Sequence, residues 1–243
     1  MGPDVQGREV TTATAPVPPR PGLRERADPV LAAIVFALFA RTFLFQAFEV
    51  PSSSMEKNVL TGDRLLVNKF LLAPSTRPLA LAGLMPSRAV RRGDIVVFRF
   101  PEDPRRDFLK RVIGLPGETV AIRNKRVYVD GRLLDEPYAF HADDRVWPDD
   151  PSIPEDGRRR DQLAARTVAP GTYFVMGDNR DDSNDSRYWG AVPAGHIEGR
   201  ALFVYWSLVP RGSDAGAGPA AILRLPLDLF RRARWDRLFR PVR

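Results

Sequence analysis

The sequence predicts a mainly β protein, in which an N-terminal transmembrane helix precedes an all-β domain outside the cytoplasm that carries an inserted β subdomain. Three observations support this fold class. One apolar run near the N-terminus, residues 29–48, is long enough for a membrane helix. Most later apolar residues are β-branched or aromatic and stand in short runs bounded by Gly, Pro, Asp or Asn, which is typical of strands. An acidic, proline-rich loop at residues 141–163 interrupts those runs.

Length and composition restrict the possible functions. The chain has 243 residues, enough for one domain with an insertion and an anchor. It has no cysteine, which excludes disulfides, thiolate metal ligands and cysteine nucleophiles. The two histidines, His141 and His196, stand far apart, so we expect no histidine-based metal site. The formal charge of +7 is spread along the chain with a concentration at the C-terminus, so nucleic acid is not an expected partner. We also expect the protein to be a monomer.

The N-terminal region predicts a tail followed by an anchor. Residues 1–28 are rich in Pro, Thr, Ala and Gly without apolar periodicity, which indicates a disordered basic tail in the cytoplasm. The twenty residues 29–48 contain Arg41, Thr42 and Gln46 as their only strongly polar members. A helix buried in a soluble core and a cleavable signal peptide are alternatives. No small-x-small cleavage site follows the run cleanly, and the basic tail is long for a signal peptide, so an uncleaved single-pass anchor is predicted.

The rest of the chain predicts strands on the outer side of the membrane. Arginines precede the anchor and Glu49 follows it, which favours a cytoplasmic N-terminus. The expected strands lie within residues 93–101, 118–134, 171–179 and 200–210. The second of these is a predicted hairpin, because Val120 and Ile122 alternate against Val127 and Val129.

An insertion divides the predicted β domain. Residues 49–120 and 165–243 are expected to form the main domain, and residues 121–164 the inserted hairpin and loop. Two segments are unusual for a soluble β domain: 78–85 is nearly all apolar, and 222–243 carries seven arginines among helically spaced apolar residues. Both are candidates for lipid contact, and the alternative for the second is packing on the β domain with solvated arginines.

Lysine is rare, and its few positions are informative. Of 37 basic residues only Lys57, Lys69, Lys110 and Lys125 are lysine, the side chain that can lose its proton near neutral pH. Lys69 and Lys125 suit a strand edge and a hairpin turn. Strand alternation in "DFLKRVIGLPG" points Lys110 and Arg111 in opposite directions, so one is expected to face inward and the other water. A buried Lys110 would have a lowered pKa and could act as a general base; the alternative is a solvated strand charge.

Three consecutive serines, residues 52–54, follow the apolar run and raise the question of a nucleophile and its base. A Ser-His-Asp triad would need His141 or His196, and neither stands in a sequence typical of a positioned base. Ser54 and Lys57 match the S-x-x-K motif of β-lactamases and penicillin-binding proteins. Those families also need S-D-N and K-T-G, whereas this chain has S-N-D and no K-T-G. We therefore treat that match as accidental.

Three long stretches, 50–70, 91–120 and 175–193, resemble in order the conserved boxes of bacterial type I signal peptidases, also called leader peptidases. The resemblance covers residues 32–208 apart from the inserted loop region. It implies a serine endopeptidase of the bacterial inner (cytoplasmic) membrane that removes signal peptides from secretory preproteins, cutting after small residues without a metal or cofactor. The expected partners are preproteins and the lipid bilayer.

The resemblance also implies a Ser-Lys dyad. Ser54 matches the nucleophile and Lys110 the general base. Ser52 matches the residue whose hydroxyl joins the backbone N–H of Ser54 in an oxyanion hole. Two alternatives remain open: a Ser-Lys processing protease for one dedicated substrate, and a non-catalytic membrane-tethered binding module.

A second set of residues is implied to support the dyad. Ser183 matches the serine that orients the lysine, and Asp185 and Arg187 match an ion pair that holds this loop, with Gly177 alongside. The chain departs from the family pattern at Lys57, where the family usually has proline. This change places a second amine near the nucleophile, so Lys57 is the alternative general base.

Overall fold

The computed structural model describes residues 23–69, 88–210 and 230–243, and the structural statements below concern these residues. The chain divides into two units, 1–38 and 39–243. The described part of the first unit is helical, and the second unit is mainly β with few helices. The segment 78–85, which the sequence marks as a candidate for lipid contact, lies outside the described residues.

The predicted anchor begins as a helix and ends as a strand. Helix α1 (Leu23–Phe39) continues into a π-helical segment, η1 (Ala40–Leu44), and strand β1 (Phe45–Glu49) follows directly. Across the described parts of the chain, we find no helix with the length and apolar character needed to cross a membrane. The prediction of one helix over residues 29–48 is therefore wrong at its C-terminal end. All five residues of β1 pair antiparallel with β2 (Asp63–Asn68). This pairing makes residues 45–49 a strand, and the local composition does not reveal it.

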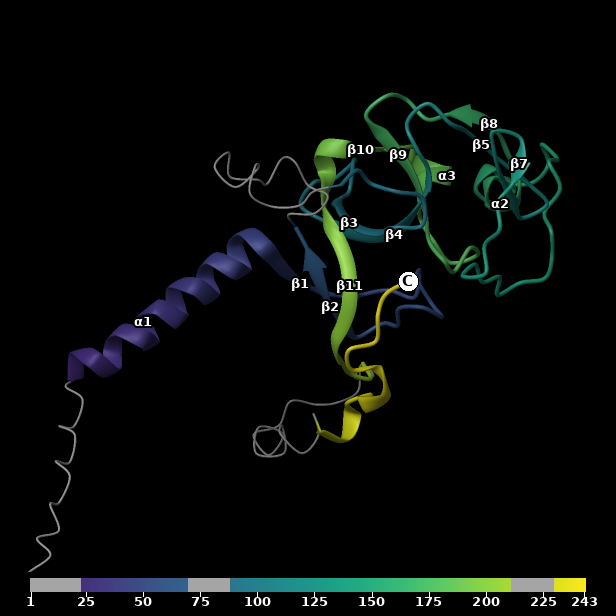
Figure 1. Ribbon diagram of the computed structural model, residues 1–243. Helices are drawn as coiled ribbons and strands as arrows, with labels where there is room; N and C mark the ends of the chain where they lie inside the picture. The colour runs from purple at the N-terminus through teal and green to yellow at the C-terminus, as the bar shows by residue number, and fades with distance from the viewer. Residues whose placement is uncertain (1–22, 70–87, 211–229) are drawn as a thin grey trace, which may run out of the picture. The chain divides into compact units, whose positions relative to one another are not determined.

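The main sheet contains seven antiparallel strands in the order β1-β2-β11-β3-β4-β9-β10 (Figure 1). Its remaining members are β3 (Ile95–Arg99), β4 (Asp107–Gly114), β9 (Thr172–Met176), β10 (Val192–Pro193) and β11 (Ile197–Ser207). Strands β3, β9 and β11 match strands expected from the sequence, although β11 begins three residues earlier than expected. Strand β4 contains the stretch in which strand alternation was expected around Lys110, and β10 was not expected. Strand β3 is buried on both faces, because Ile95 and Val97 join one hydrophobic cluster while Val96 and Phe98 join another.

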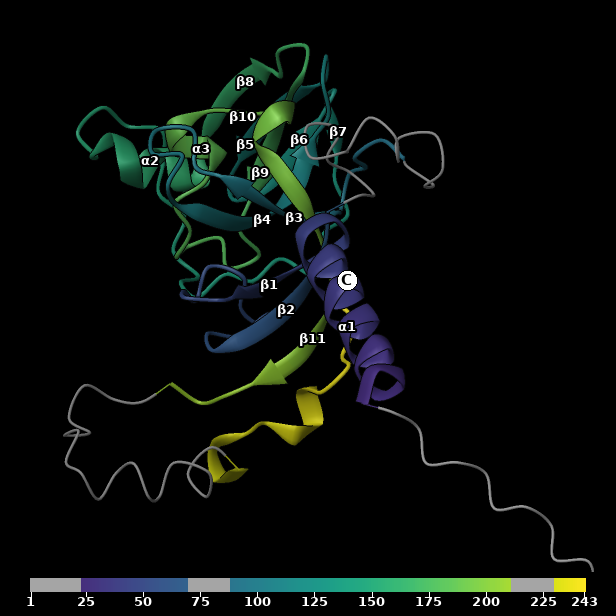
Figure 2. The same ribbon diagram turned by 90° about the vertical axis from the view of Figure 1, so that its left-hand side faces the viewer.

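A second sheet of four strands, in the order β7-β6-β5-β8, lies beyond β9 at the end of the domain opposite β1 and β2 (Figures 1 and 2). Its strands are β5 (Thr119–Arg123), β6 (Arg126–Val129), β7 (Arg132–Leu133) and β8 (Leu163–Thr167), and helix α2 (Glu155–Asp161) precedes β8. The predicted hairpin is confirmed, since Val120 pairs with Val129 and Ile122 with Val127. The sheet includes part of the predicted insert, 121–164, and extends two or three residues beyond it at each side.

The described C-terminal residues, 230–243, pack on the β domain. The backbone amide of Val204 in β11 donates to the carbonyl of Arg240 at 2.9 Å, and Val242 lies in the hydrophobic core. Arg237 is only 3% exposed. The packed alternative for this segment is therefore correct for residues 230–243, although its arginines are not all solvated. Residues 222–229 lie outside the described part.

Candidate active site

The loop between β1 and β2, residues 50–62, carries the three serines, and we call it the serine loop. At its base the backbone amide of Val50 donates to the carbonyl of Asp63 at 2.9 Å, which continues the pairing of the two strands. Met55 is buried in the core next to β2. Because Met55 follows Ser54 directly, this packing holds the Ser54 backbone in place.

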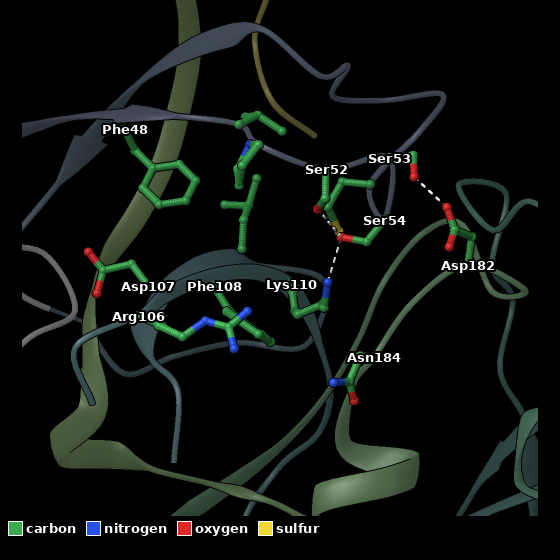
Figure 3. Close-up of a pocket in the computed structure, with 14 residues that line it drawn as sticks. Phe48, Ser52, Ser53, Ser54, Arg106, Asp107, Phe108, Lys110, Asp182 and Asn184 are labelled. Atoms are coloured by element: carbon green, nitrogen blue, oxygen red, sulfur yellow. Dashed lines mark hydrogen bonds between the residues drawn. The ribbon is translucent and has the colours of Figure 1, made fainter. Parts of the chain in front are cut away.

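Lys110 lies on β4 and points at Ser54 (Figure 3). Its Nζ donates to the Ser54 Oγ at 2.5 Å, and the lysine side chain is buried, with the residue 4% exposed. Among the described residues no carboxylate forms an ion pair with Lys110. Lys57, the alternative base, instead places its Nζ 4.1 Å from the centroid of the Phe140 ring. The structure thus brings Lys110, and not Lys57, to the serine.

The environment of Lys110 favours its neutral form. Burial lowers the pKa of the amine from the ordinary 10.5 to about 8, because the charged form loses its hydration. The negative charge of Asp185 opposes this shift and the positive charge of Arg187 adds to it. A substantial fraction of the amine is therefore unprotonated at mildly alkaline pH, and a neutral amine can accept the hydroxyl proton of Ser54.

Ser52 lies on the open side of the dyad. Its Oγ is 3.3 Å from the Ser54 Oγ, and the residue is exposed to the cleft in front of both serines. A hydroxyl at this position can donate a hydrogen bond to an oxygen that becomes negatively charged when Ser54 attacks a carbonyl carbon.

Behind the dyad, a buried ion pair holds the loop between β9 and α3 (Ser186–Trp189). Arg187 Nε lies 2.8 Å from Asp185 Oδ1, and both side chains are fully buried. The other oxygen of Asp185 accepts from the backbone amide of Gly177 at 3.0 Å. Burial raises the pKa of the Asp185 carboxyl, but Arg187, the backbone amide of Gly177 and the charge of Lys110 together more than offset this and hold that pKa below its usual range. The carboxylate therefore stays charged and keeps the loop closed.

Glycine is required at position 177 by close contacts. A Cβ there would lie 2.3 Å from the Ser183 Oγ and 2.5 Å from the carbonyl oxygen of Ser54. Any side chain would push the loop between β9 and α3 away from Ser54. The Ser183 Oγ is itself buried and has no hydrogen-bond partner among the described residues, so its role in orienting Lys110 stays a prediction.

A cleft of about 510 Å³ opens in front of the dyad. Phe48, Arg106 and Phe108 line one end of it, and Asp182 lies at the other, with Ser54 between them (Figure 3). Strand β1 is an edge strand of the main sheet, and β4 pairs with β9 only from Arg111 onward. Among the described strands none pairs with these two edges, so both can offer backbone groups to the cleft.

Comparison with known proteins identifies the family. A family model described as "Signal peptidase, peptidase S26" matches residues 23–206. The chain belongs to this family of signal peptidases. It is 36% identical over 197 residues to signal peptidase I of Pseudomonas aeruginosa, a match that covers 72% of this chain and 69% of the relative. Signal peptidase I of Aquifex aeolicus is 29% identical over 266 residues, covering 90% of this chain and 99% of the relative.

A solved signal peptidase I from Enterococcus faecalis V583 shares 37% sequence identity with this chain, covers 46% of it and gives a TM-score of 0.36. The family assignment depends on the sequence matches. The chain is thus a serine peptidase, a hydrolase that acts on preproteins with signal peptides, as the resemblance implied.

The sequence prediction for Arg111 is wrong for this member of the signal peptidase family. Arg111 does lie on the face of β4 opposite Lys110, but it is 2% exposed and does not meet water. Its Nε and Nη2 donate to the two carboxylate oxygens of Asp178 at 2.7 and 2.6 Å. The prediction overlooked Asp178, which follows β9 and neutralises the arginine inside the protein.

Sequence reasoning also missed Asn179 as a support for the peptidase site. Its backbone amide donates to the carbonyl of Ser54 at 3.1 Å. The available signal was its place in the third family box, beside Gly177. The histidines take no part in the site: His196 Nδ1 lies 3.2 Å from the carbonyl of Arg99, and His141 Nδ1 lies 3.6 Å from Asp181. The structure therefore gives no support to a Ser-His-Asp triad.

Proposed function

We propose that the chain is a membrane-anchored serine endopeptidase that removes signal peptides from secreted preproteins with a Ser54–Lys110 dyad. The observation that carries this proposal is the 2.5 Å hydrogen bond between Lys110 Nζ and Ser54 Oγ in a buried site. Membership of the signal peptidase family supports the substrate class.

The geometry supports a two-step acyl transfer. Neutral Lys110 takes the proton of Ser54 as Oγ attacks the carbonyl carbon of the scissile bond. The hydroxyl of Ser52 and the backbone N–H of Ser54 stabilise the oxyanion that forms. The Lys110 ammonium then protonates the leaving amine, and the signal peptide remains bound to Ser54 as an ester. Neutral Lys110 next deprotonates a water molecule as it attacks the ester, and the resulting ammonium returns the proton to Ser54 Oγ as the signal peptide leaves as a carboxylic acid.

The open strand edges support binding of an extended substrate. A peptide lying between β1 and β4 can form backbone hydrogen bonds with both, as in β-strand addition. Side chains of an extended peptide alternate in direction, so the first and third residues before the cut point to the same wall. Phe48, Val50, Phe108 and Leu109 contribute apolar side chains to the cleft, which suits small apolar residues at those two positions.

The helical segment before β1 supports membrane anchoring. Apolar side chains of α1 are exposed, namely Val30, Leu31, Ile34, Val35, Phe36 and Leu38. We infer that these side chains contact lipid in the bacterial cytoplasmic membrane, with the N-terminus inside and the catalytic domain, 49–120 with 165–243, outside. Confinement to the plane that holds the signal peptide raises the effective concentration of the substrate.

The experiment is preprotein cleavage by the full chain in detergent, with products identified by mass spectrometry. We expect the wild-type protein to cut several unrelated preproteins once, after a small residue, and Ser54→Ala to cut none. Cleavage of only one preprotein from the panel would favour the dedicated-substrate alternative. Absence of cleavage by the wild type, or full activity in Ser54→Ala, would refute the proposed function.

A further inference from the structure

The C-terminal segment, residues 230–243, lies beyond the region that the family model matches. It runs beside β11 past Arg200, where the pairing of β11 with β3 ends (Figure 1, yellow). The backbone amide of Phe239 donates to the carbonyl of Val204 at 2.8 Å, and the amide of Val242 to that of Leu202 at 2.9 Å. These bonds fix the segment next to the second half of β11.

From this position two arginines reach the second half of the serine loop. Arg234 Nη1 donates to the carbonyl of Thr61 at 3.1 Å, and Arg237 makes the larger set of contacts. Arg237 Nη2 donates to Asp63 Oδ2 at 2.6 Å and to the carbonyl of Asn58 at 3.0 Å, and Arg237 Nε donates to Asp63 Oδ1 at 3.0 Å. Asp63 is fully buried, and its carboxylate also accepts from the amide of Leu60 at 2.8 Å and the hydroxyl of Ser207 at 2.6 Å. The guanidinium of Arg237 thus connects Asn58 and Asp63, at the second half of the serine loop.

A short turn links those points to the nucleophile. The backbone amides of Asn58 and Val59 donate to the carbonyl of Met55, at 3.2 and 2.9 Å, and Met55 follows Ser54. A second contact reaches the same turn, because Asn58 Nδ2 donates to the backbone oxygen of Arg243. The serine loop is therefore held from two directions, by Asn179 at Ser54 itself and by the C-terminal segment at Asn58 and Asp63.

We propose that Arg237 is a positioning residue for the dyad: it fixes the second half of the serine loop so that Ser54 stays in hydrogen-bond reach of Lys110. The inference rests on the proposed function. Catalysis is sensitive to such placement, since a displacement of about 1 Å can cost roughly 100-fold in rate. A purely structural ion pair would instead affect unfolding alone, because loss of one partner leaves the buried carboxylate of Asp63 uncompensated and destabilises the folded state without changing the geometry at Ser54.

The test compares three variants of the full chain in detergent. Arg237→Gln removes the bridge. Arg237→Lys keeps a positive charge for Asp63 but loses the fork that reaches Asn58 at the same time. The matched control is Arg232→Gln. Arg232 lies in the same segment, and its Nε donates to the carbonyl of Val209 at 3.0 Å, outside the serine loop. For each variant kcat and KM are measured separately for preprotein cleavage, at a temperature where circular dichroism shows the folded state.

We expect Arg237→Gln to lower kcat by roughly 100-fold and Arg237→Lys by about tenfold, with KM within about threefold of wild type and Arg232→Gln unchanged in both. If Arg237→Gln does not fold, Arg237→Lys decides the question. A kcat within about twofold of wild type in the folded Arg237 variants, or an equal loss in Arg232→Gln, would overturn the inference. Wild type and Ser54→Ala, measured in parallel, report separately on the proposed function.

Discussion

Two adjacent residues of β4 show how this fold treats buried cations. Lys110 and Arg111 point to opposite faces of the strand, and both are buried. Arg111 makes two charge-assisted hydrogen bonds to the carboxylate of Asp178. Lys110 bonds only to the neutral hydroxyl of Ser54 and has no ion-pair partner among the residues described. The difference teaches that an interior guanidinium needs a counter-charge, whereas an interior amine without one can lose its proton.

The choice of side chain follows from this difference. A guanidinium stays protonated at any physiological pH, so an interior arginine needs a counter-charge. An ammonium can lose its proton, and burial brings the pKa of Lys110 to about 8. One face of β4 therefore holds a structural cation and the other holds the lysine that we propose as the base.

The largest effect on activity is expected when Lys110 is replaced by arginine, the residue type of its neighbour Arg111. Lys110→Arg should lower kcat/KM for preprotein cleavage by at least about 10⁴-fold, because arginine cannot accept the proton of Ser54. Cleavage assays with circular dichroism as a check on folding measure this loss. Activity within about tenfold of wild type would show that another group is the base.

Removal of the partner of Arg111 should act on stability. Asp178→Asn leaves a buried arginine without its counter-charge, and we expect the free energy of unfolding to fall by about 3 to 5 kcal/mol. The control is Glu49→Gln, since Glu49 pairs with Arg64 at the surface, where loss of an ion pair costs at most about 1 kcal/mol. Denaturant unfolding in detergent compares the two. Equal losses would contradict the contrast between paired interior and surface arginines.

Removal of Lys110 should instead raise the free energy of unfolding. The pKa of Lys110 is lowered from 10.5 to about 8 on folding, which corresponds to a cost of about 3 kcal/mol when the side chain is charged in both states. This cost is fully present below pH 8 and fades between pH 8 and 10.5, where the unfolded chain binds more protons than the folded one.

Lys110→Met should therefore be more stable than wild type at pH 7, and its advantage should shrink towards pH 10. Paired unfolding curves of both proteins at the two pH values measure the difference, because pH effects from other residues cancel. A less stable Lys110→Met, or an advantage independent of pH, would be inconsistent with a buried lysine that loses its proton.

The smallest effect on activity is expected from replacement of Lys57, the alternative base. Lys57→Ala should change kcat/KM by no more than about threefold, because the Nζ of Lys57 lies over the Phe140 ring and not beside Ser54. The same preprotein assay applies. A loss as large as that of Lys110→Arg would instead assign the role of base to Lys57.

Local patterns in the sequence were sufficient for much of the fold. Alternation predicted the pairs of the β5–β6 hairpin. The turn at Leu115-Pro116-Gly117 was also predictable: Gly117 has φ +88°, and the Glu118 amide donates to the carbonyl of Leu115 at 3.1 Å. The resemblance to known boxes placed Ser54 and Lys110 together. These features depend on neighbours in sequence or on motifs with a fixed geometry.

Features that depend on distant partners were not predictable. The residues Phe45–Phe48 are apolar enough for a helix, and only their pairing with β2 makes them a strand. Burial of Arg111 depends on Asp178, and burial of Arg237 depends on Asp63. In both ion pairs the partners are far apart in the sequence, so no local pattern shows that the charge is neutralised.

The most direct test of the claim that Lys110 is an unpaired, titratable base is its own pKa. The chain has four lysines, so side-chain NMR of lysine-labelled protein gives few signals, and the Lys110→Met variant identifies the one that belongs to Lys110. We expect that signal to titrate with a midpoint near pH 8. A midpoint near the ordinary 10.5 would contradict the assignment of Lys110 as the base.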